Sequence, residues 1–598
     1  MHHRKEPDNL VDLLEYSVSR CPNNRVFGTK DSSGVYQWIT YRELGGRVDN
    51  LRAGLNAIGI KKDDAIGLIA NNRTEWAIAA FATYGLGARF IPMYEAELAS
   101  VWKYIVSDSK VKTLFVATPK IYKEVSGFLD QIPTLENIFI IDDQGENTMT
   151  WLEDKGRSKP VASIKPKPGD IAGLVYTSGT TGEPKGVLLS HGNFTSNALA
   201  GYHLYPELSP DSVSISILPW AHSFGQTAEL YNFLQCGSSI GFMGSVATLS
   251  EDMAMVKPTH MVAVPRVFNK IHDGIWAKMN EKGGLTKKLF VFAVNTAQKR
   301  RKLADQGLSD PVVELRFKIV DRLVFKKIRD GFGGRLLGAL TASATMNTEI
   351  SKFFFDMNIP VYDCYGLSET SPGITMSCPA AHKLGSVGKA IEYVKVVIDK
   401  SVVEDGAIDG EIIAYGPNIM QGYHNKPEAT KEVMTKDGGF RTGDRGRLDE
   451  DGFLYITGRI KEQFKLQNGK YVFPSALEED IKLLPEITNA LIYGDGRAYN
   501  TCIVVPDFNV IGRYARENNL PDDPERLIKE KSIQDSITTK ITAHLKKLYG
   551  GYEIPKKFIF TAEDFTMENG MLTQTMKLKR RVVLKKYMDR IEELYKSK

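Results

Sequence analysis

The 598-residue sequence has few of the features that mark secreted or membrane-spanning proteins. Its five cysteines are scattered, so neither a zinc-binding spacing nor a disulfide framework is expected. It contains no run of about 18 apolar residues, the length that a membrane-spanning helix needs. Its first residues lack an apolar signal core, and its last residues do not read Ser-Lys-Leu. These absences favour a reducing, cytoplasmic compartment.

The sequence also lacks a strong excess of either charge. A total of 77 Lys and Arg against 72 Asp and Glu gives a net charge of +5, which does not indicate a nucleic-acid partner at this length. With 42% hydrophobic and 25% charged residues, the composition is typical of globular proteins. A chain of this length exceeds what one hydrophobic core supports, so at least two domains are expected.

The most unusual stretch present is Tyr176–Gly186, which reads YTSGTTGEPKG and follows an apolar strand candidate. Its glycines let backbone N–H groups turn toward an anion, its hydroxyls donate further hydrogen bonds, and Lys185 adds a positive charge. The common phosphate loop requires a second glycine where this sequence has Pro184, so that pattern does not match. The stretch predicts a polyphosphate site of another kind, with a flexible surface turn as the alternative.

Strand and helix patterns alternate from about residue 36 to residue 175. Ala65–Ile69 is one apolar strand candidate, and Arg42–Ile58 carries apolar residues at helical spacing. Such alternation predicts a parallel or mixed sheet covered by helices, with ligands beyond the carboxyl ends of the strands. Short antiparallel strands are expected near residues 394–415 and 452–456. A smaller α+β pattern begins after Gly458–Glu462, which predicts a domain boundary there.

Five segments, in order, resemble the motifs of the adenylate-forming enzymes, the superfamily of acyl-CoA synthetases, peptide synthetase adenylation domains and luciferases. Within it the sequence is most similar to long-chain fatty acyl-CoA synthetases, and the resemblance extends from about residue 10 to residue 590. The five motif segments are Tyr176–Gly186, Leu218–His222, Tyr365–Thr370, Gly439–Asp444 and Gly458–Lys461. The long-chain resemblance rests on Val264–Phe268, Tyr493–Arg497 and Leu572–Arg580.

The resemblance implies an α/β fold in two domains. Residues 1–460 would form a large N-terminal adenylation domain of α/β sheets with a small β-barrel-like part. Residues 461–598 would form a small, mobile α+β domain that carries a catalytic lysine and the thiolation face. Lys461 matches the hinge about which that domain would rotate between the two half-reactions.

The implied activity is that of an ATP-dependent long-chain fatty acid–CoA ligase. A carboxylate attacks the α-phosphorus of ATP to give acyl-AMP and pyrophosphate, and the coenzyme A thiol then displaces AMP. ATP, Mg²⁺ and coenzyme A are the expected cofactors and co-substrates, and the oligomeric state stays open. The alternatives are a medium-chain, aryl or other carboxylate–CoA ligase, an acyl-AMP ligase without the coenzyme A step, and a catalytically silent binding protein.

The resemblance also assigns roles to individual residues. Glu369 would contact magnesium together with Thr181, Asp444 would accept the ribose hydroxyls, and Arg459 would donate to the sugar or to phosphate. Tyr365 and Gly366 would contact adenine, and Thr370 the α-phosphate. The β- and γ-phosphates would be held by Thr177, Ser178, Gly179, Thr180, Thr181, Gly182 and Lys185.

Lys577 is the expected catalytic lysine of the adenylation step, because its charge would offset charge that develops at the α-phosphate. It lies in a basic run, which is more often a solvated surface, and only the resemblance selects Lys577 over Lys579. His222 would lie near the substrate carboxylate, although a lone histidine is more often structural. Gly469 and Lys470 would belong to the coenzyme A face.

Three features depart from the family pattern or stand outside it. Ala342–Thr345 replaces the usual Gly-Gly-Ala-Pro, and Gln226 stands where thermophilic relatives have a gating tryptophan. Neither change removes a charged catalytic group, so activity is expected. Leu315–Ile328 is basic and amphipathic, which predicts either a peripheral membrane contact or a helix packed on its own domain.

Overall fold

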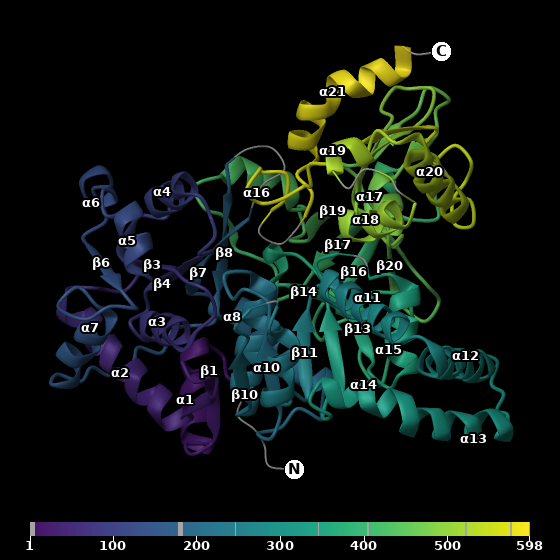
Figure 1. Cartoon of the computed structure of the whole chain (residues 1–598). Coiled ribbons are helices and arrows are strands. Elements are labelled where there is room, and N and C mark those ends of the chain that lie inside the picture. Colours follow the sequence, from purple (N-terminus) through teal and green to yellow (C-terminus); the bar gives the residue numbers. More distant parts are fainter. Residues whose placement is uncertain are drawn as a thin grey trace. The chain divides into compact units, whose positions relative to one another are not determined.

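The computed structural model describes residues 6–177, 183–245, 247–344, 346–403, 406–518, 520, 523–573 and 577–596. The chain divides into two compact units (Figure 1). The first unit comprises Met1–Val397, Ile413–Arg441 and Asp449–Leu454, and the second comprises Ile398–Ile412, Thr442–Leu448 and Tyr455–Lys598. The boundary predicted at residues 460 and 461 stays a prediction.

A seven-stranded sheet in the first unit has the order β18-β8-β7-β4-β3-β5-β6. Strands β3 to β7 pair in parallel, whereas β8 and β18 continue the sheet in antiparallel pairs. Helices α4 and α5 lie on one side of these strands and α3 and α7 on the other (Figure 1). The strands are β3 (Ala65–Ile69), β4 (Arg89–Met93), β5 (Val111–Val116), β6 (Asn137–Ile140), β7 (Ile171–Thr177), β8 (Lys185–Ser190) and β18 (Gly422–Tyr423).

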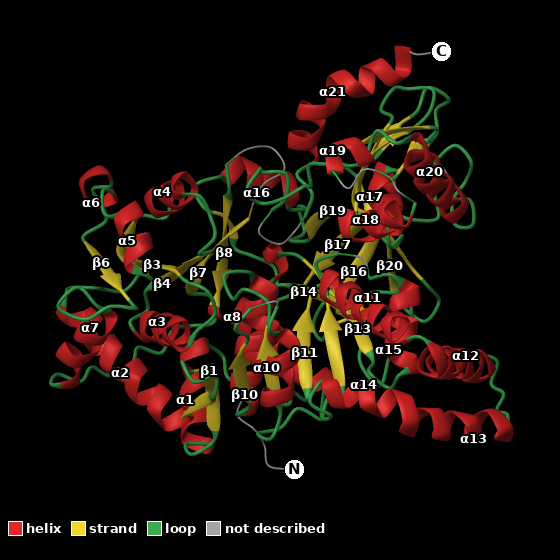
Figure 2. Cartoon of the chain, viewed as in Figure 1, coloured by secondary structure: helices red, strands yellow, loops and turns green. Residues whose placement is uncertain are grey.

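A nine-stranded sheet in the same unit has the order β15-β14-β13-β12-β11-β9-β10-β1-β2. Its six central strands are parallel, and antiparallel strands close both ends, as the alternating pattern predicted. Figure 2 shows β11 and β13 of this sheet, and β12 lies between them in the strand order. The strands are β1 (Arg25–Lys30), β2 (Tyr36–Thr40), β9 (Val213–Ser216), β10 (Ser239–Phe242), β11 (His260–Ala263), β12 (Gly338–Thr341), β13 (Val361–Gly366), β14 (Gly373–Met376) and β15 (Lys389–Ala390).

Several helices of the first unit begin where a short polar side chain caps the backbone. Ser190 caps α8 directly after β8, with reciprocal bonds to Asn193. The α-helices are α1 (Leu10–Arg20), α2 (Tyr41–Ala57), α3 (Thr74–Gly85), α4 (Ala99–Asp108), α5 (Pro119–Val125), α6 (Phe128–Gln131), α7 (Met149–Arg157), α8 (His191–Leu204), α9 (Asn232–Cys236), α10 (Leu249–Val256), α11 (Pro265–Lys282), α12 (Gly284–Asp305), α13 (Pro311–Val320), α14 (Lys326–Gly331), α15 (Thr348–Asp356) and α16 (Pro427–Val433). The π-helical segments η1 (Gly225–Tyr231) and η2 (Asp321–Phe325) and the 3₁₀ turn η3 (Ser368–Thr370) complete the set.

The β-rich segment after residue 394 forms an open sheet, so the predicted barrel-like part is wrong. The sheet has the order β16-β17-β19-β20, and its end strands do not pair with each other in the part of the chain that is described. Closing a barrel requires the two end strands of the sheet to pair with each other. The four described strands of this sheet therefore do not form a barrel. The strands are β16 (Lys395–Asp399), β17 (Gly410–Tyr415), β19 (Phe440–Leu448) and β20 (Leu454–Arg459), and the 3₁₀ turn η4 (Lys400–Val402) follows β16.

The rest of the second unit is the expected α+β domain. A three-stranded sheet has the order β23-β24-β25, and two apolar clusters form its core. The strands are β21 (Phe464–Lys465), β22 (Tyr471–Val472), β23 (Ile487–Tyr493), β24 (Thr501–Pro506) and β25 (Lys557–Phe560). The helices are α17 (Pro474–Ile481), α18 (Phe508–Glu517), α19 (Pro524–Leu527), α20 (Lys531–Leu545) and α21 (Arg580–Lys596).

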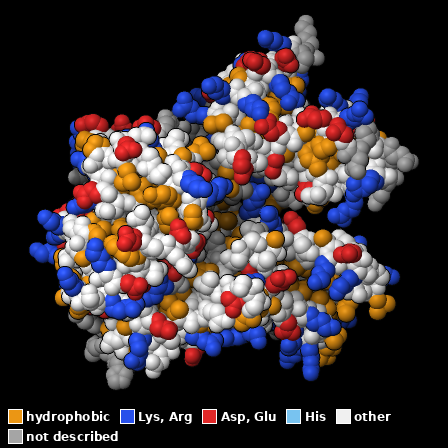
Figure 3. Space-filling model, turned by 60° about the vertical axis from the view of Figure 1, so that its left-hand side comes forward, with side chains coloured by type: hydrophobic (Ala, Val, Ile, Leu, Met, Phe, Trp, Pro, Cys, Tyr) orange, Lys and Arg blue, Asp and Glu red, His pale blue; other side chains and the backbone are white. Residues whose placement is uncertain are grey.

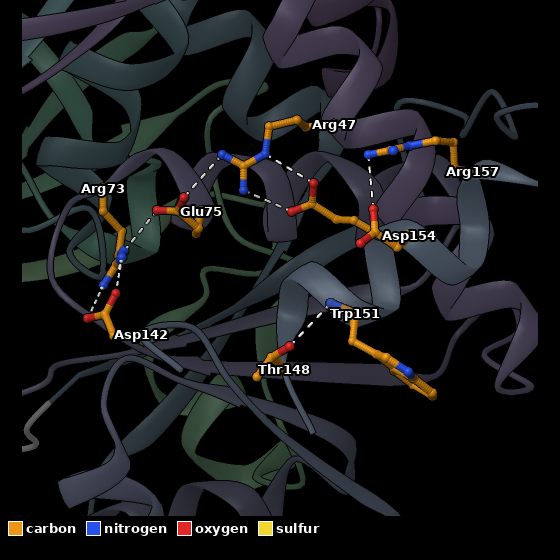
Figure 4. Close-up of polar contacts among 9 residues, drawn as sticks. Arg47, Arg73, Glu75, Asp142, Thr148, Trp151, Asp154 and Arg157 are labelled. Atoms are coloured by element: carbon orange, nitrogen blue, oxygen red, sulfur yellow. Dashed lines mark hydrogen bonds and ion pairs between the residues drawn. The ribbon is translucent and has the colours of Figure 1, made fainter. Parts of the chain in front are cut away.

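A chain of ion pairs ties together helices of the first unit (Figure 4). Arg47 of α2 contacts Glu75 of α3 at 3.1 Å and Glu153 of α7 at 2.9 Å. Arg73 donates to the other oxygen of Glu75 at 2.9 Å and forms a bidentate pair with Asp142. Burial would raise the pKa of Glu75, but Arg73 and Arg47 hold that pKa below its ordinary value. The network therefore acts as a scaffold that fixes helices around the seven-stranded sheet.

The carboxyl group of Glu229 on η1 is fully buried beneath the nine-stranded sheet. It accepts hydrogen bonds from Ser214 at 2.7 Å and Ser216 at 2.5 Å on β9, and from the Trp220 indole at 2.8 Å. Burial raises the pKa of Glu229 to about 7, although the three hydrogen bonds oppose that shift. The group thus anchors Trp220, which belongs to the Leu218–His222 motif.

We expect the stability of the protein to depend on pH through Glu229. The pKa of Glu229 is about 7 in the folded chain, compared with an ordinary value of 4.5 that applies to the unfolded chain. Between these two pH values, the folded chain keeps a proton on Glu229 that the unfolded chain has lost. The stabilisation is complete below pH 4.5 and is lost, by about 3 kcal/mol, as pH rises through 7. Denaturation in urea from pH 5 to pH 8 measures this slope. Glu229→Gln should flatten it, whereas Glu124→Gln, on an exposed face of α5, should not. Equal slopes in the two variants would contradict this role.

The described helices include none that is both long and apolar enough to cross a membrane. On the face drawn in Figure 3, basic and acidic side chains are interspersed. All five cysteines are free, and four of them are buried. These findings agree with the absence of a disulfide framework expected from the sequence.

Candidate active site

The glycine- and threonine-rich stretch connects two paired strands. Thr177 ends β7, Lys185 begins β8, and the two residues lie opposite each other in the antiparallel pair. The stretch therefore leaves the sheet at the carboxyl end of β7, as predicted. Five residues to which we assigned phosphate contacts lie outside the described residues: Ser178, Gly179, Thr180, Thr181 and Gly182.

Glu369 lies in η3, close to the strand that pairs with β8. Its carboxylate accepts a hydrogen bond from the Tyr423 hydroxyl at 2.7 Å, and its carbonyl accepts one from the Met420 N–H at 2.9 Å. The Lys185 ammonium lies 4.9 Å from the centre of the Tyr423 ring. One buried tyrosine thus contacts both the predicted magnesium ligand and the predicted phosphate-binding lysine. The sequence analysis missed Tyr423, because nothing local to Gly422–Tyr423 indicates its partners.

Two residues of the Tyr365–Thr370 motif have structural reasons for their identity. A Cβ atom on Gly366 would lie 1.7 Å from the Pro372 carbonyl oxygen, so only glycine fits there. The buried Thr370 hydroxyl donates to the Leu367 carbonyl at 3.1 Å and accepts from the Leu367 N–H at 3.0 Å. Its predicted contact with the α-phosphate stays a prediction, as does the predicted stacking of Tyr365 on adenine.

A pocket that is partly open to solvent lies in the first unit beside this motif. It extends along β11 and β12, from His260 at one end to Ala342 beyond the other. Four residue steps along β12, from Gly338 to Ala342, give a length of about 13 Å. Most of its lining is apolar, and it includes Tyr365, Gly366, His222, Leu208, Phe224, Phe233, Met261, Val262 and Met376. A pocket of this shape suits an extended apolar chain.

His222 belongs to that pocket lining, and its predicted place near the substrate carboxylate stays a prediction. Its Nδ1 accepts the backbone N–H of Phe224 at 3.1 Å, so the neutral imidazole carries its proton on Nε2. Gln226, which stands at the gating position, is buried instead. Its amide donates to the Tyr231 hydroxyl at 2.6 Å, and that hydroxyl pairs with Tyr84 at 2.7 Å.

The replacement of the usual glycines by Ala342 and Ser343 has a backbone consequence. Both residues line the pocket, and Ser343 has a φ of +76°, in the left-handed region that favours glycine. A residue other than glycine in such a conformation lowers the stability of the folded protein by about 1–3 kcal/mol. The serine therefore lines the pocket in a backbone conformation that lowers the stability of the fold.

We expect Ser343→Gly to raise the free energy of unfolding by about 1 kcal/mol, because relief of strain exceeds the added entropy of the unfolded chain. Urea denaturation measures the difference. The control is Ala344→Gly at the next position, where φ is not positive, and it should lower stability slightly. A loss of stability in both variants would contradict the strain at Ser343.

In the second unit, Asp444 and Arg459 form an ion pair at 2.8 Å between the Arg459 Nε and the Asp444 Oδ1. Asp444 is 4% exposed, and its backbone N–H donates to the Thr442 hydroxyl at 3.1 Å. The structure thus brings together the two residues predicted to bind the ribose. The ion pair fixes the orientation of the carboxylate.

The structure describes the chain as far as Thr573 and again from Lys577. The side chain of Lys577 is exposed. Its N–H donates to the Thr573 hydroxyl at 3.0 Å, and its carbonyl accepts the Thr573 N–H at 2.8 Å. Two other cations of the basic run have structural partners, since Arg580 pairs with Glu478 at 2.6 Å and Lys586 pairs with Glu563. Lys577 and Lys579 are both exposed, so burial does not separate them.

The predicted hinge and coenzyme A residues are also exposed residues of the second unit. Lys461 follows β20, and Gly469 has a φ of +82° in the turn between β21 and β22. The Lys470 ammonium lies 4.4 Å from the centre of the Tyr552 ring. The roles of all three stay predictions.

The described residues contain no cluster of three or more His, Cys, Asp or Glu that would form a metal site made only of protein ligands. Mg²⁺ usually takes one or two carboxylates and completes its shell with water and substrate phosphates. The single carboxylate of Glu369, near Lys185, fits a magnesium ion of that kind.

Comparison with known proteins places the sequence in a family. A family model described as AMP-binding enzyme matches residues 14–424, and one described as AMP-binding enzyme C-terminal domain matches residues 461–598. Long-chain-fatty-acid–CoA ligase FadD15 of Mycobacterium bovis is 30% identical, covering 99% of this chain and 97% of the relative. Fatty acyl-CoA synthetase A of Dictyostelium discoideum is 31% identical, covering 97% of this chain and 90% of the relative.

Solved structures share the fold. The anthranilate CoA ligase AuaEII in complex with anthranoyl-AMP matches with a TM-score of 0.75 at 18% identity, covering 99% of both chains. ATP-bound MatB from Rhodopseudomonas palustris matches with a TM-score of 0.71 at 22% identity, covering 97% of this chain and 99% of that one. The chain therefore belongs to the AMP-binding, adenylate-forming enzyme family and is similar along its full length to long-chain-fatty-acid–CoA ligases.

Proposed function

We propose that the protein is an AMP-forming ligase that joins long-chain fatty acids to coenzyme A at the expense of ATP. The observation that carries this proposal is the apolar pocket along β11 and β12, whose lining includes Tyr365 and Gly366 of the nucleotide motif. A carboxylic acid bound there would have its tail among apolar side chains and its carboxylate at the nucleotide end. The full-length relatives named as long-chain fatty acid ligases support the same substrate class.

The first half-reaction needs the carboxylate and the α-phosphate in line, with charge stabilisation rather than a protein nucleophile. Lys185 supplies positive charge for the departing pyrophosphate, Thr370 contacts the α-phosphate, and His222 lies near the substrate carboxylate. Mg²⁺ bound by Glu369 would neutralise phosphate charge. Asp444 and Arg459 bind the sugar, and Lys577 offsets charge at the α-phosphate. The coenzyme A thiol then attacks the acyl carbonyl and releases AMP, with Gly469 and Lys470 on the coenzyme A face.

A panel of acids tests the proposal. The protein is incubated with ATP, Mg²⁺, coenzyme A and one acid from a series that runs from butyrate to stearate and includes benzoate. AMP and thioester should form fastest with the long saturated chains. Fastest turnover of benzoate or butyrate would favour the other carboxylate–CoA ligases. Acyl-AMP without thioester would favour a ligase without the coenzyme A step, and the absence of pyrophosphate exchange with every acid would favour a silent binding protein.

We propose further that the protein is cytoplasmic and contacts anionic membrane surfaces through α13 and η2. Val313, Phe317, Val320 and Val324 are buried, which accounts for one apolar face of this segment. A second apolar face is about half exposed and consists of Val312, Leu315, Ile319 and Leu323. Residues 284–331 contain twelve Lys or Arg and five Asp or Glu, a net charge of +7 in a chain whose total is +5. Exposed apolar side chains among basic ones suit the interface of an anionic bilayer.

Flotation with liposomes tests this contact. The protein should float with vesicles that contain phosphatidylglycerol and remain below pure phosphatidylcholine vesicles. The double variant Leu315→Ser, Ile319→Ser should lose flotation. Leu98→Ser combined with Ile408→Ser removes two apolar side chains that are equally exposed elsewhere, and it should float normally. If the Leu315→Ser, Ile319→Ser variant floats like the unmodified protein, α13 and η2 are not the membrane contact.

A further inference from the structure

Tyr423 contacts two residues that lie far apart in the sequence and belong to different motifs. Its hydroxyl donates to Glu369 Oε1 at 2.7 Å, and its ring faces the Lys185 ammonium at 4.9 Å from the ring centre. The tyrosine is 8% exposed, so neither contact is loosened by bulk water. A hydrogen bond to a carboxylate and a cation above a ring each fix the direction of a flexible side chain.

The backbone around Tyr423 is fixed to both partners as well. Tyr423 lies opposite Val187 of β8, and the His424 N–H donates to the Gly186 carbonyl at 2.8 Å, next to Lys185. The Met420 N–H donates to the Glu369 carbonyl at 2.9 Å. The segment 420–424 therefore connects the end of the phosphate-binding stretch to the turn that carries Glu369.

We propose that Tyr423 is a positioning residue of the nucleotide site: its hydroxyl orients Glu369 toward the magnesium ion, and its ring orients Lys185 toward the phosphates. This inference rests on the proposed function, in which Glu369 and Lys185 bind Mg²⁺ and ATP. The Tyr423 hydroxyl donates to the carboxylate, and the ring separately faces the Lys185 ammonium. The two halves of the side chain thus have separable roles.

The chain provides a matched control for this arrangement. Tyr415 also donates its hydroxyl to a carboxylate, that of Asp437, at 3.1 Å and 3.2 Å from the two oxygens. Lys395 lies over its ring, with the ammonium 6.0 Å from the ring centre. This second set of tyrosine, carboxylate and lysine lies outside the motifs. Substitution of Tyr415 therefore measures how the loss of the same kinds of contact affects ATP binding when the contacts lie outside the nucleotide motifs.

The test measures ATP binding by calorimetry, without acid or coenzyme A, at a series of free Mg²⁺ concentrations. In Tyr423→Phe, which removes only the hydroxyl, the Mg²⁺ concentration that gives half of the maximal ATP affinity should rise about tenfold. The affinity at saturating Mg²⁺ should be unchanged. In Tyr423→Leu, which also removes the ring, the affinity at saturating Mg²⁺ should fall by about three- to tenfold as well. Tyr415→Phe and Tyr415→Leu should match the unmodified protein in both quantities.

Each result decides part of the proposal. An unchanged Mg²⁺ requirement in Tyr423→Phe overturns the role of the hydroxyl, and equal ATP affinities of the Phe and Leu variants at saturating Mg²⁺ overturn the role of the ring. Similar changes in the Tyr415 variants overturn both. If Tyr423→Leu does not fold, Tyr423→Phe alone still tests the carboxylate. This test measures ATP binding and no turnover. If the protein binds MgATP but forms no thioester in the acid panel, the proposed function is refuted, but the role of Tyr423 in binding can still be tested.

Discussion

Lys577→Ala should slow the formation of acyl-AMP by about 100- to 1,000-fold, the effect of removing one group that stabilises transition-state charge. The adenylation step develops negative charge at the α-phosphate, and a lysine there offsets it. The second half-reaction forms its new bond at the acyl carbon rather than at phosphorus, so the charge of the attack develops on the carbonyl oxygen, and AMP then leaves with the electron pair of the broken acyl C–O bond. The rate of thioester formation from supplied acyl-AMP should therefore change by less than about threefold.

The neighbouring Lys579 provides the control for this variant. It is two residues away, is also exposed and lies in the same basic run, so Lys579→Ala causes a similar loss of general charge. Lys579→Ala should leave both half-reactions nearly unchanged. Equal losses in both half-reactions of Lys577→Ala would assign Lys577 a structural role. A selective loss in Lys579→Ala would move the catalytic role to that residue.

Asp444→Asn should raise the KM for ATP by about ten- to 100-fold while changing kcat less. A hydrogen bond to an ionised group contributes about 1.5–3 kcal/mol, and Asp444 would make such bonds to the ribose hydroxyls. Because the ribose stays bound through both half-reactions, its contacts contribute equally to ground and transition states. The KM for acyl-AMP in the second half-reaction should therefore rise by a similar factor.

This prediction separates Asp444 from Lys577, since one variant should impair both half-reactions and the other only the first. Asp409 serves as the control, because it forms a buried ion pair with Arg445 at 2.5 Å in the same unit and has no assigned ligand. Asp409→Asn should lower stability without a selective change in nucleotide KM. Unchanged KM values for ATP and acyl-AMP in Asp444→Asn would exclude the ribose contact.

The sequence predicted the strands that carry the site because each is a local apolar run. β3 spans Ala65–Ile69 as expected, and Ile171–Val175 lies within β7, which leads into the phosphate-binding stretch. The motif series also assigned Glu369 and Lys185 to one nucleotide site; in the structure both contact Tyr423, and their roles stay predictions. The strand predictions succeeded because they depend on residues close in sequence.

The features that the sequence did not predict depend on contacts between distant residues. Tyr423 pairs with β8, more than 200 residues earlier, and no local pattern indicates that register. The strands after residue 394 were expected to be barrel-like, but strand order is a property of the fold and the sheet is open. Serine disfavours the left-handed backbone conformation, so the sequence does not predict that conformation at Ser343. Only the backbone of the structure shows it.

The most direct test of the account is a single assay of the unmodified protein with palmitate, ATP, Mg²⁺ and coenzyme A, in which AMP and palmitoyl-CoA are both quantified. The account predicts one AMP for each palmitoyl-CoA, with pyrophosphate and no ADP, and no product when any one component is omitted. Formation of ADP, or AMP release without a thioester for palmitate and every other acid, would contradict it.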